Sequence, residues 1–220
     1  MSTHPVWLFD LDNTLHDANP YIFPHINRLM REYIERHLQL DSASASQLRQ
    51  QYWQRYGATL LGLVRHHRVD PAHFLWETHQ FPDLRAMLVA DRTLPVRLRQ
   101  LRGRKLVFSN APRHYTEAVL QLTGLRPCFD QVYPVESTRL QPKPATGGFL
   151  RLLHQEGLRP QQCIMVEDSL INLMAAKRLG MKTVWVARTL RGAACVDLKV
   201  RSVAQLPGLQ GRLGICPVPA

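Results

Sequence analysis

Two aspartates separated by one residue follow an apolar run near the start of the sequence. Residues 6–9 (VWLF) are apolar without alternation, as expected of a strand buried on both faces, and Asp10 and Asp12 come next. Side chains two residues apart in an extended chain lie on the same side, so we expect the two carboxylates to converge on one small space. Like charges so placed need a cation or a shared proton, and a divalent metal ion meets this need.

Further polar residues stand where other predicted strands or loops end. Ser109 and Asn110 follow a second apolar run, Lys143 lies in a loop, and Glu167 and Asp168 follow a third apolar run. Ligands of open α/β sheets bind at the carboxyl ends of the strands. We therefore expect these side chains to meet at one edge of a sheet.

Together these residues suit phosphoryl transfer, which needs a nucleophile, a metal ion, positive charge around the phosphate oxygens and a proton donor. Asp10 stands first at its strand end and is the candidate nucleophile, forming an aspartyl phosphate. Asp12 would give a proton to the leaving group and later take one from water. Asp168 would complete, with Asp10, an all-oxygen site for Mg²⁺.

The phosphate itself also needs partners. Ser109, Asn110 and nearby backbone N–H groups are the candidates for holding its oxygens. Lys143 would neutralise charge as a compact ammonium. These assignments complete the set that the sequence predicts for the reaction.

The elements that must position these residues alternate between strand and helix. Strands are predicted at 6–9, 105–110, 131–134, 163–166 and 183–186, and helices at about 113–123, 145–155 and 170–179. Repeats of this length imply parallel pairing with right-handed crossovers. The predicted fold class is α/β, a doubly wound parallel sheet formed by residues 1–16 plus 93–190.

Residues 17–92 carry helix signals and no strand signal. A helix is predicted at 21–38 and another from about Ser46, which Gly57 and Gly62 weaken or end, while Asp70 before a proline is typical of a helix start. We expect this segment to be a helical insertion. The tail at 191–220 shows little periodicity among its prolines and glycines and is predicted to be loosely structured.

Composition narrows the class of protein. The 220 residues are 45% hydrophobic, enough for a full core, and the four cysteines form no CxxC pair. Because the cysteines are too sparse for a disulfide framework and the first residues lack the apolar run of a signal peptide, we expect a reduced, cytoplasmic protein. No apolar run approaches the roughly 20 residues that cross a bilayer, so we expect no membrane partner. The formal charge of +11 attracts anions, but no nucleic-acid-binding motif accompanies it, so a small phosphorylated substrate is the expected partner. The oligomeric state stays open.

The four groups of polar residues resemble, in order and in predicted structure, the motifs of the haloacid dehalogenase superfamily over residues 5–190. The resemblance implies a Rossmann-like core, a helical cap of the first cap class, and metal ligation by Asp10, the Asp12 backbone carbonyl and Asp168. The aspartate at position 12 resembles the second aspartate of the phosphatases and mutases in this superfamily, which the true dehalogenases lack. Where many members have a second acid, this chain has Asn172, so we expect no carboxylate ligand there and assign Asn172 a role in orienting a ligand or a water. The matching motifs are 10–14, 105–110, 143–144 and 167–169.

A narrower resemblance is to the pyrimidine 5′-nucleotidase branch, which implies hydrolysis of UMP or CMP. Tyr56 and His66 are further candidates for contact with the substrate, although packing within the insertion is favoured for Tyr56 taken alone, and a solvent-facing or structural role is the alternative for His66. The residues that carry it are 12–15, 56–57, 60–63, 66–67, 70–71 and 179–183.

Other readings of the same residues remain open. Thr14, Arg113 and Glu167 are further candidates for contact with the substrate or support of the site, and Arg113 is alternatively an ordinary cation at a helix start. A sugar-phosphate phosphatase, a phosphoglycolate phosphatase or a phosphoglucomutase-type enzyme could use the same core. A non-catalytic nucleic-acid-binding protein is the alternative from another functional class.

Overall fold

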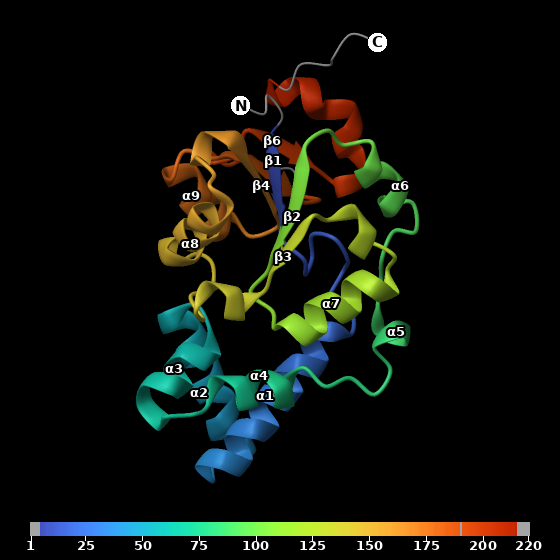
Figure 1. Cartoon of the computed structure of the whole chain (residues 1–220). Helices are drawn as coiled ribbons and strands as arrows, with labels where there is room; N and C mark the ends of the chain where they lie inside the picture. Colours follow the sequence, from blue (N-terminus) through green and yellow to red (C-terminus); the bar gives the residue numbers. More distant parts are fainter. Residues whose placement is uncertain (1–4, 190, 215–220) are drawn as a thin grey trace. The chain divides into compact units, whose positions relative to one another are not determined.

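The computed structural model describes residues 5–189 and 191–214 of the chain (Figure 1). It divides into two compact units. The sheet unit comprises Met1–Asp17 and Val89–Ala220, and the helical unit comprises Ala18–Leu88. The insertion that the sequence places at 17–92 therefore corresponds to a unit that is slightly shorter at both ends.

A six-stranded parallel sheet with the order β3-β2-β1-β4-β5-β6 forms the centre of the sheet unit. The order runs outward from β1 in both directions, as expected when right-handed crossovers wind the chain to each side. This confirms the predicted α/β doubly wound sheet. The strands are β1 (Val6–Phe9), β2 (Arg104–Phe108), β3 (Gln131–Tyr133), β4 (Cys163–Glu167), β5 (Lys182–Val186) and β6 (Leu198–Val200).

Helices cover both faces of this sheet, with α8 and α9 on one face and α6 and α7 on the other (Figure 1). They are α6 (Leu94–Arg99), α7 (Arg113–Leu122), α8 (Thr146–Glu156) and α9 (Leu170–Arg178). The connections also contain short 3₁₀ helices, η1 (Arg126–Cys128), η2 (Val135–Thr138), η3 (Pro160–Gln162) and η4 (Val203–Leu213).

Strand β1 is apolar without alternation because both of its faces are buried. Val6 and Leu8 belong to the hydrophobic core that includes the buried side chains of α8 and α9. Phe9 points to the other face, where its ring meets the edge of the Phe129 ring with centroids 5.7 Å apart. The residues that follow β1 are thus carried on a rigid, fully covered strand.

The prediction of a loosely structured tail at 191–220 was wrong for the part that the structure describes. Strand β6 pairs in parallel with β5 and adds the sixth strand to the sheet. Helix η4 follows it and buries Leu206 and Leu213, although Pro207 lies inside it. A three-residue strand is too short to show a period, and proline and glycine mask the helix signal, so burial in the tertiary structure decided the outcome. Residues 215–220 lie outside the described residues.

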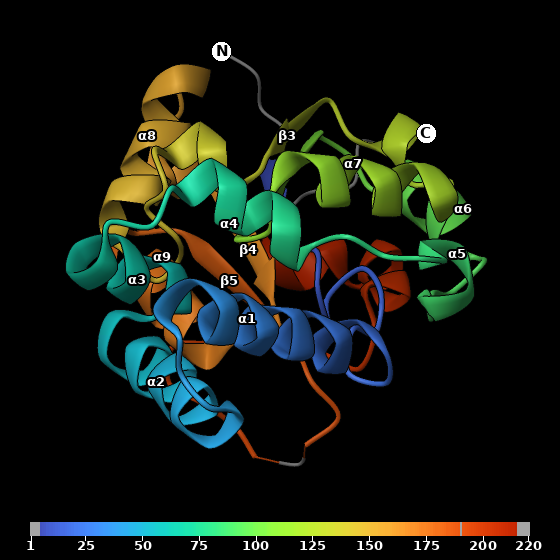
Figure 2. The ribbon, with the colours of Figure 1, turned by 90° about the horizontal axis from the view of Figure 1, so that it is seen from below.

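The helical unit consists of α1 (Ile22–Leu38), α2 (Ser42–Tyr56), α3 (Thr59–His67), α4 (Pro71–Thr78) and α5 (Leu84–Met87). Figure 2 shows α1 flanked by α2 and α4, in agreement with their contacts. Gly57 ends α2 with a φ of 79°, and the Asp70 carboxylate accepts from Ala72 N at 3.0 Å to start α4 as predicted. None of the helices among the described residues combines the length and apolar composition that crossing a membrane requires.

Gly103 lies just before β2 and tests how closely the chain packs at the amino ends of β1 and β2. Its φ is +96°, and a Cβ there would lie 2.1 Å from the carbonyl oxygen of Pro5, just before β1. Gly124 has a φ of +70° but open space around it. We expect Gly124→Ala to lower the free energy of unfolding by about 1 kcal/mol and Gly103→Ala by about 3 kcal/mol, measured by chemical denaturation. Equal losses would show that the approach to Pro5 does not matter.

Candidate active site

Three neighbouring strands end at the same level in the centre of the sheet. The register pairs the last residue of β1 with Val107 on β2 and with Val166 on β4. The next positions along the three strands are Asp10, Phe108 and Glu167. The strand pairing alone therefore places two acidic residues and one backbone carbonyl beside each other.

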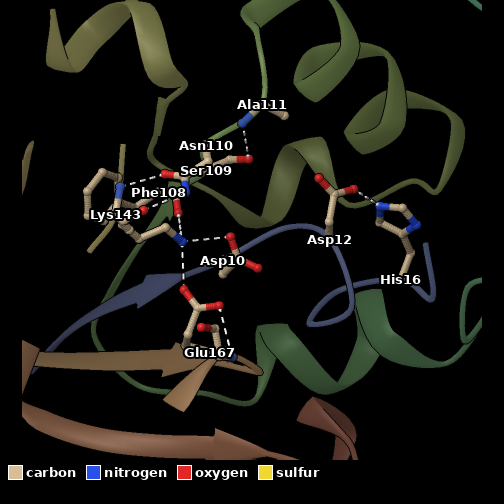
Figure 3. A network of polar contacts seen from close by, with 10 residues as sticks. Asp10, Asp12, His16, Phe108, Ser109, Asn110, Ala111, Lys143 and Glu167 are labelled. Carbon is tan, nitrogen blue, oxygen red and sulfur yellow. Dashed lines mark hydrogen bonds and ion pairs between the residues drawn. The ribbon is translucent and has the colours of Figure 1, made fainter. Parts of the chain in front are cut away.

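Lys143 joins these three strand ends (Figure 3). Its Nζ donates to Asp10 Oδ1 at 2.6 Å, to the Phe108 carbonyl oxygen at 2.7 Å and to Glu167 Oε2 at 2.7 Å. The Lys143 side chain is fully buried. An ammonium has three N–H donors, and here each donor has an acceptor. Lys143 is thus fixed against the carboxylates, which is consistent with the predicted role of neutralising charge.

Asn110 holds the loop that carries Lys143. Its Nδ2 donates to the Lys143 carbonyl at 2.9 Å, and its Oδ1 accepts from the Lys143 backbone N–H at 2.8 Å. The side chain that the sequence assigns to phosphate binding thus anchors the lysine loop. Ser109, the other predicted phosphate ligand, is buried, and its Oγ accepts from the Ala111 backbone N–H at 3.0 Å.

Burial of these charges shifts their pKa values. Burial raises the pKa of Asp10 to about 7; the Glu167 charge adds to the rise, and the Lys143 ammonium opposes it. Burial also raises the pKa of Glu167 to about 7, again against Lys143. Burial by itself lowers the pKa of Lys143, but contact with the two carboxylates outweighs this and raises it. Lys143 therefore stays protonated.

Asp168 joins Asp10 and Glu167 to form an acidic group of three residues. One carboxylate oxygen each from Asp10, Glu167 and Asp168 lie within 4.8 Å of one another. The Trp185 indole N–H fixes the Asp168 backbone by donating to its carbonyl at 2.8 Å. Burial raises the pKa of the Asp168 carboxyl as well. Three ionised carboxylates beside one ammonium would leave two uncompensated negative charges in a buried space, and an oxygen-ligated divalent cation fits both the charge and the donor set.

Asp12 has different hydrogen-bond partners from Asp10, although its charge is close enough to add to the rise in the pKa of Asp10. Strand β1 ends at Phe9, and Asn13, the residue after Asp12, turns the chain with a φ of 60°. The Asp12 Oδ1 accepts from the Tyr115 hydroxyl at 2.6 Å and contacts His16 Nε2 at 2.9 Å. Figure 3 shows the Asp12 carboxylate turned toward His16.

The other predicted residues of the sheet unit have varied contacts. Thr14 is buried, and its hydroxyl has no hydrogen-bond partner among the described residues. The Arg113 backbone N–H donates to the Glu136 carboxylate, and its guanidinium donates to the Ser137 hydroxyl at 3.2 Å, so both groups engage η2. Asn172 is a buried residue in the first turn of α9.

Tyr56 and His66 belong to the helical unit and contact each other there. A hydrogen bond of 2.6 Å joins the Tyr56 hydroxyl and His66 Nε2. The guanidinium of Arg65 lies 5.9 Å from the centre of the Tyr56 ring. The pair connects α2 with α3 and leaves His66 exposed.

Sequence reasoning missed His16 and Tyr115, the two partners of Asp12. His16 stands four residues after Asp12, a spacing visible in the sequence but without a strand or helix to interpret it. Tyr115 is a buried residue of α7 and reads as an ordinary core aromatic. Its hydroxyl meets Asp12 across 103 positions, so only the folded chain reveals the contact.

Three curated relatives match parts of the chain. Pyrophosphatase PpaX of Bacillus velezensis is 38% identical over 74 residues, 34% of this chain and 34% of PpaX. Phosphate metabolism protein 8 of Saccharomyces cerevisiae is 24% identical over 194 residues, 80% of this chain and 59% of that protein. Fructose-1-phosphate phosphatase YqaB of Escherichia coli is 37% identical over 68 residues, 31% of this chain and 36% of YqaB. The chain thus spans less than two thirds of each relative.

Solved structures share the fold over nearly the whole chain. A HAD phosphatase from Thermococcus onnurineus superposes with a TM-score of 0.67 at 23% identity, covering 94% of this chain and 98% of its own. The HAD hydrolase YfnB from Bacillus subtilis, a structure bound to magnesium, superposes with a TM-score of 0.62 at 16% identity, covering 94% and 99%.

A family model places the chain more firmly than these single matches. The model of haloacid dehalogenase-like hydrolases matches residues 6–180, which include β1, the helical unit, Lys143 and the Glu167–Asp168 pair. The match thus spans the strands and the loop that carry Asp10, Lys143, Glu167 and Asp168. The chain belongs to the haloacid dehalogenase-like hydrolase family.

Proposed function

We propose that this chain is a Mg²⁺-dependent phosphomonoesterase that works through an aspartyl phosphate on Asp10. One observation carries the proposal: the buried Lys143 ammonium contacts Asp10 and Glu167 at the edge where Asp168 also lies. A carboxylate held in this way is positioned to attack, and the surrounding charges are those that a phosphate dianion requires.

In the first step, a carboxylate oxygen of Asp10 attacks phosphorus. The Asp10 Oδ1 accepts from Lys143, so the other oxygen is the proposed nucleophile. The new O–P bond forms as the bond from phosphorus to the ester oxygen breaks. Asp12 gives its proton to the departing oxygen, and the alcohol leaves.

In the second step, water attacks the phosphorus of the aspartyl phosphate. Asp12, now ionised, takes a proton from that water, and the bond between Asp10 and phosphorus breaks. Inorganic phosphate is released, and both aspartates return to their starting states. Ser109 and backbone N–H groups at the same edge would hold the phosphate oxygens during both steps.

The proposed metal site uses Asp10, Asp168, Glu167 and the Asp12 backbone carbonyl. Mg²⁺ bound there would offset the repulsion between the carboxylates and the incoming phosphate. The oxygen donors of the acidic group and its excess negative charge support this assignment, as does the magnesium bound in the structurally similar YfnB.

The proposed substrates are pyrimidine nucleoside 5′-monophosphates, UMP and CMP. The motif resemblance to the pyrimidine 5′-nucleotidase branch supports this choice. In the helical unit, Tyr56, His66 and Arg65 combine aromatic rings with positive charge, a chemistry that suits a base and an anion.

A sugar-phosphate phosphatase is the second candidate. The match to a fructose-1-phosphate phosphatase supports it, and the same core chemistry would serve both substrates. We also propose a cytoplasmic location for either enzyme. The free thiols of Cys128, Cys163 and Cys195 are consistent with a reducing compartment.

Asp10→Asn tests the nucleophile. A neutral amide cannot attack phosphorus in place of a carboxylate, so we expect release of phosphate from p-nitrophenyl phosphate to fall at least about 1,000-fold. The fold is expected to persist, as judged by circular dichroism. Turnover close to that of the unchanged protein would remove Asp10 from this role.

A substrate panel separates the two candidate functions. We expect UMP and CMP to give a kcat/KM at least about tenfold above those of AMP, fructose 1-phosphate, phosphoglycolate and glucose 1-phosphate, measured by release of inorganic phosphate. A clear preference for a sugar phosphate would favour the second candidate and leave the catalytic proposal intact.

The raised pKa values of Asp10 and Glu167 predict how metal and pH act on stability. A carboxyl with a pKa near 7 in the fold, against ordinary values of 3.8 and 4.5, favours the folded state below about pH 4. This contribution is lost as the pH rises through 7. In EDTA we therefore expect the Tm to fall from pH 5 to pH 8, and Mg²⁺ to raise the Tm more at pH 8 than at pH 6.

Asp168→Asn is the matched control for this measurement. Removal of one carboxylate from the proposed metal site should shrink the Mg²⁺-dependent rise in Tm at pH 8. A rise that is equal in both proteins, or equal at both pH values, would contradict the proposed metal site.

A further inference from the structure

Asp12 is held by two donors that come from distant parts of the chain. The Tyr115 hydroxyl reaches Asp12 Oδ1 at 2.6 Å from α7, and His16 Nε2 reaches the same oxygen at 2.9 Å from the segment after β1. The Tyr115 hydroxyl oxygen also lies 3.4 Å from His16 Nε2. Both side chains are almost completely buried. Each of these three side chains therefore contacts the other two inside the sheet unit.

The direction of each hydrogen bond follows from the chemistry of the donors. The Tyr115 hydroxyl donates to Asp12 Oδ1, because an ionised carboxylate oxygen can only accept. His16 donates to Asp12 when its hydrogen is on Nε2. Its Nδ1 is buried and has no partner among the described residues, so no acceptor there competes for that hydrogen.

Both donors meet one oxygen of Asp12. Two hydrogen bonds on Oδ1 fix the plane of the carboxylate and occupy that oxygen as an acceptor. A proton carried by Asp12 is therefore carried on Oδ2. The Lys143 ammonium, by contrast, forms ion pairs with the Asp10 and Glu167 carboxylates.

We infer that Tyr115 and His16 are positioning residues for proton transfer by Asp12, an inference that rests on the proposed phosphomonoesterase function. They orient Asp12 so that Oδ2 faces the leaving oxygen. As the proton passes from Oδ2 to the leaving oxygen, negative charge develops on Asp12, and the two donors stabilise it at Oδ1.

This role predicts a dependence on the leaving group. An alkyl alcohol such as a nucleoside departs poorly without a proton, whereas p-nitrophenol departs readily as an anion. Loss of a positioning residue should therefore slow alkyl phosphates far more than p-nitrophenyl phosphate. A loss of packing alone would slow every substrate by a similar factor.

The experiment compares kcat/KM for p-nitrophenyl phosphate, phenyl phosphate and the best alkyl phosphate of the panel. This constant reports the steps up to departure of the leaving group. We expect Tyr115→Phe to lower it about 10- to 100-fold for the alkyl phosphate and less than about threefold for p-nitrophenyl phosphate. His16→Leu should act alike, and His16→Gln, which keeps an N–H donor, should recover part of the loss.

Tyr133→Phe is the matched control. It removes another tyrosine hydroxyl of the sheet unit that donates to a carboxylate, here Glu156 Oε1 at 2.5 Å. We expect it to change kcat/KM by less than about twofold for every substrate. Thermal unfolding of each variant checks that the fold is retained.

The outcomes separate this inference from the function on which it rests. Equal losses on all three substrates, or no loss in Tyr115→Phe, would overturn the positioning role while the enzyme remains a phosphatase. A wild-type protein inactive on every phosphate ester would overturn the proposed function itself, and the inference with it.

Discussion

The contact of one buried ammonium with three strand ends is the interaction on which the proposed site depends. Lys143 Nζ satisfies the Phe108 carbonyl and neutralises part of the charge of Asp10 and Glu167, all within 2.7 Å. Removing a partner from a buried ion pair typically costs about 3–5 kcal/mol, because the remaining charge stays buried. The lysine is therefore both a structural tie between β1, β2 and β4 and the source of positive charge beside the proposed nucleophile.

The two aspartates of the first motif differ in chemistry because their partners differ. Asp10 contacts an ammonium and lies within reach of two other carboxylates, surroundings that suit a nucleophile and a metal ligand. Asp12 lies after the end of β1, beyond which Asn13 turns the chain, and it meets a phenol and an imidazole. These donors suit a group that must hold and release a proton. The two roles proposed within one motif thus correspond to two different sets of hydrogen-bond partners.

Much of the sheet unit was predictable because its signals are local. The unbroken apolar runs of β1 and β4 predict the buried strands that the structure shows, and the acidic residues at their carboxyl ends lie together as expected. Strand β6 escaped because three residues show no period, and the helix η4 contains Pro207. The position of Asn110 near the site was predictable. Its hydrogen bonds to the Lys143 backbone were not, since they join residues 33 positions apart.

The sequence by itself determined the fold class and the residue types that could do chemistry, because hydrophobic periodicity and motif order are written along the chain. Only the tertiary structure decided which partners each of these residues has. Strand register brought Asp10, Phe108 and Glu167 to one level, and the packing of α7 brought Tyr115 to Asp12. Such contacts join positions about 100 or more residues apart, and hydrogen bonds depend on differences of a few tenths of an ångström that no linear pattern encodes.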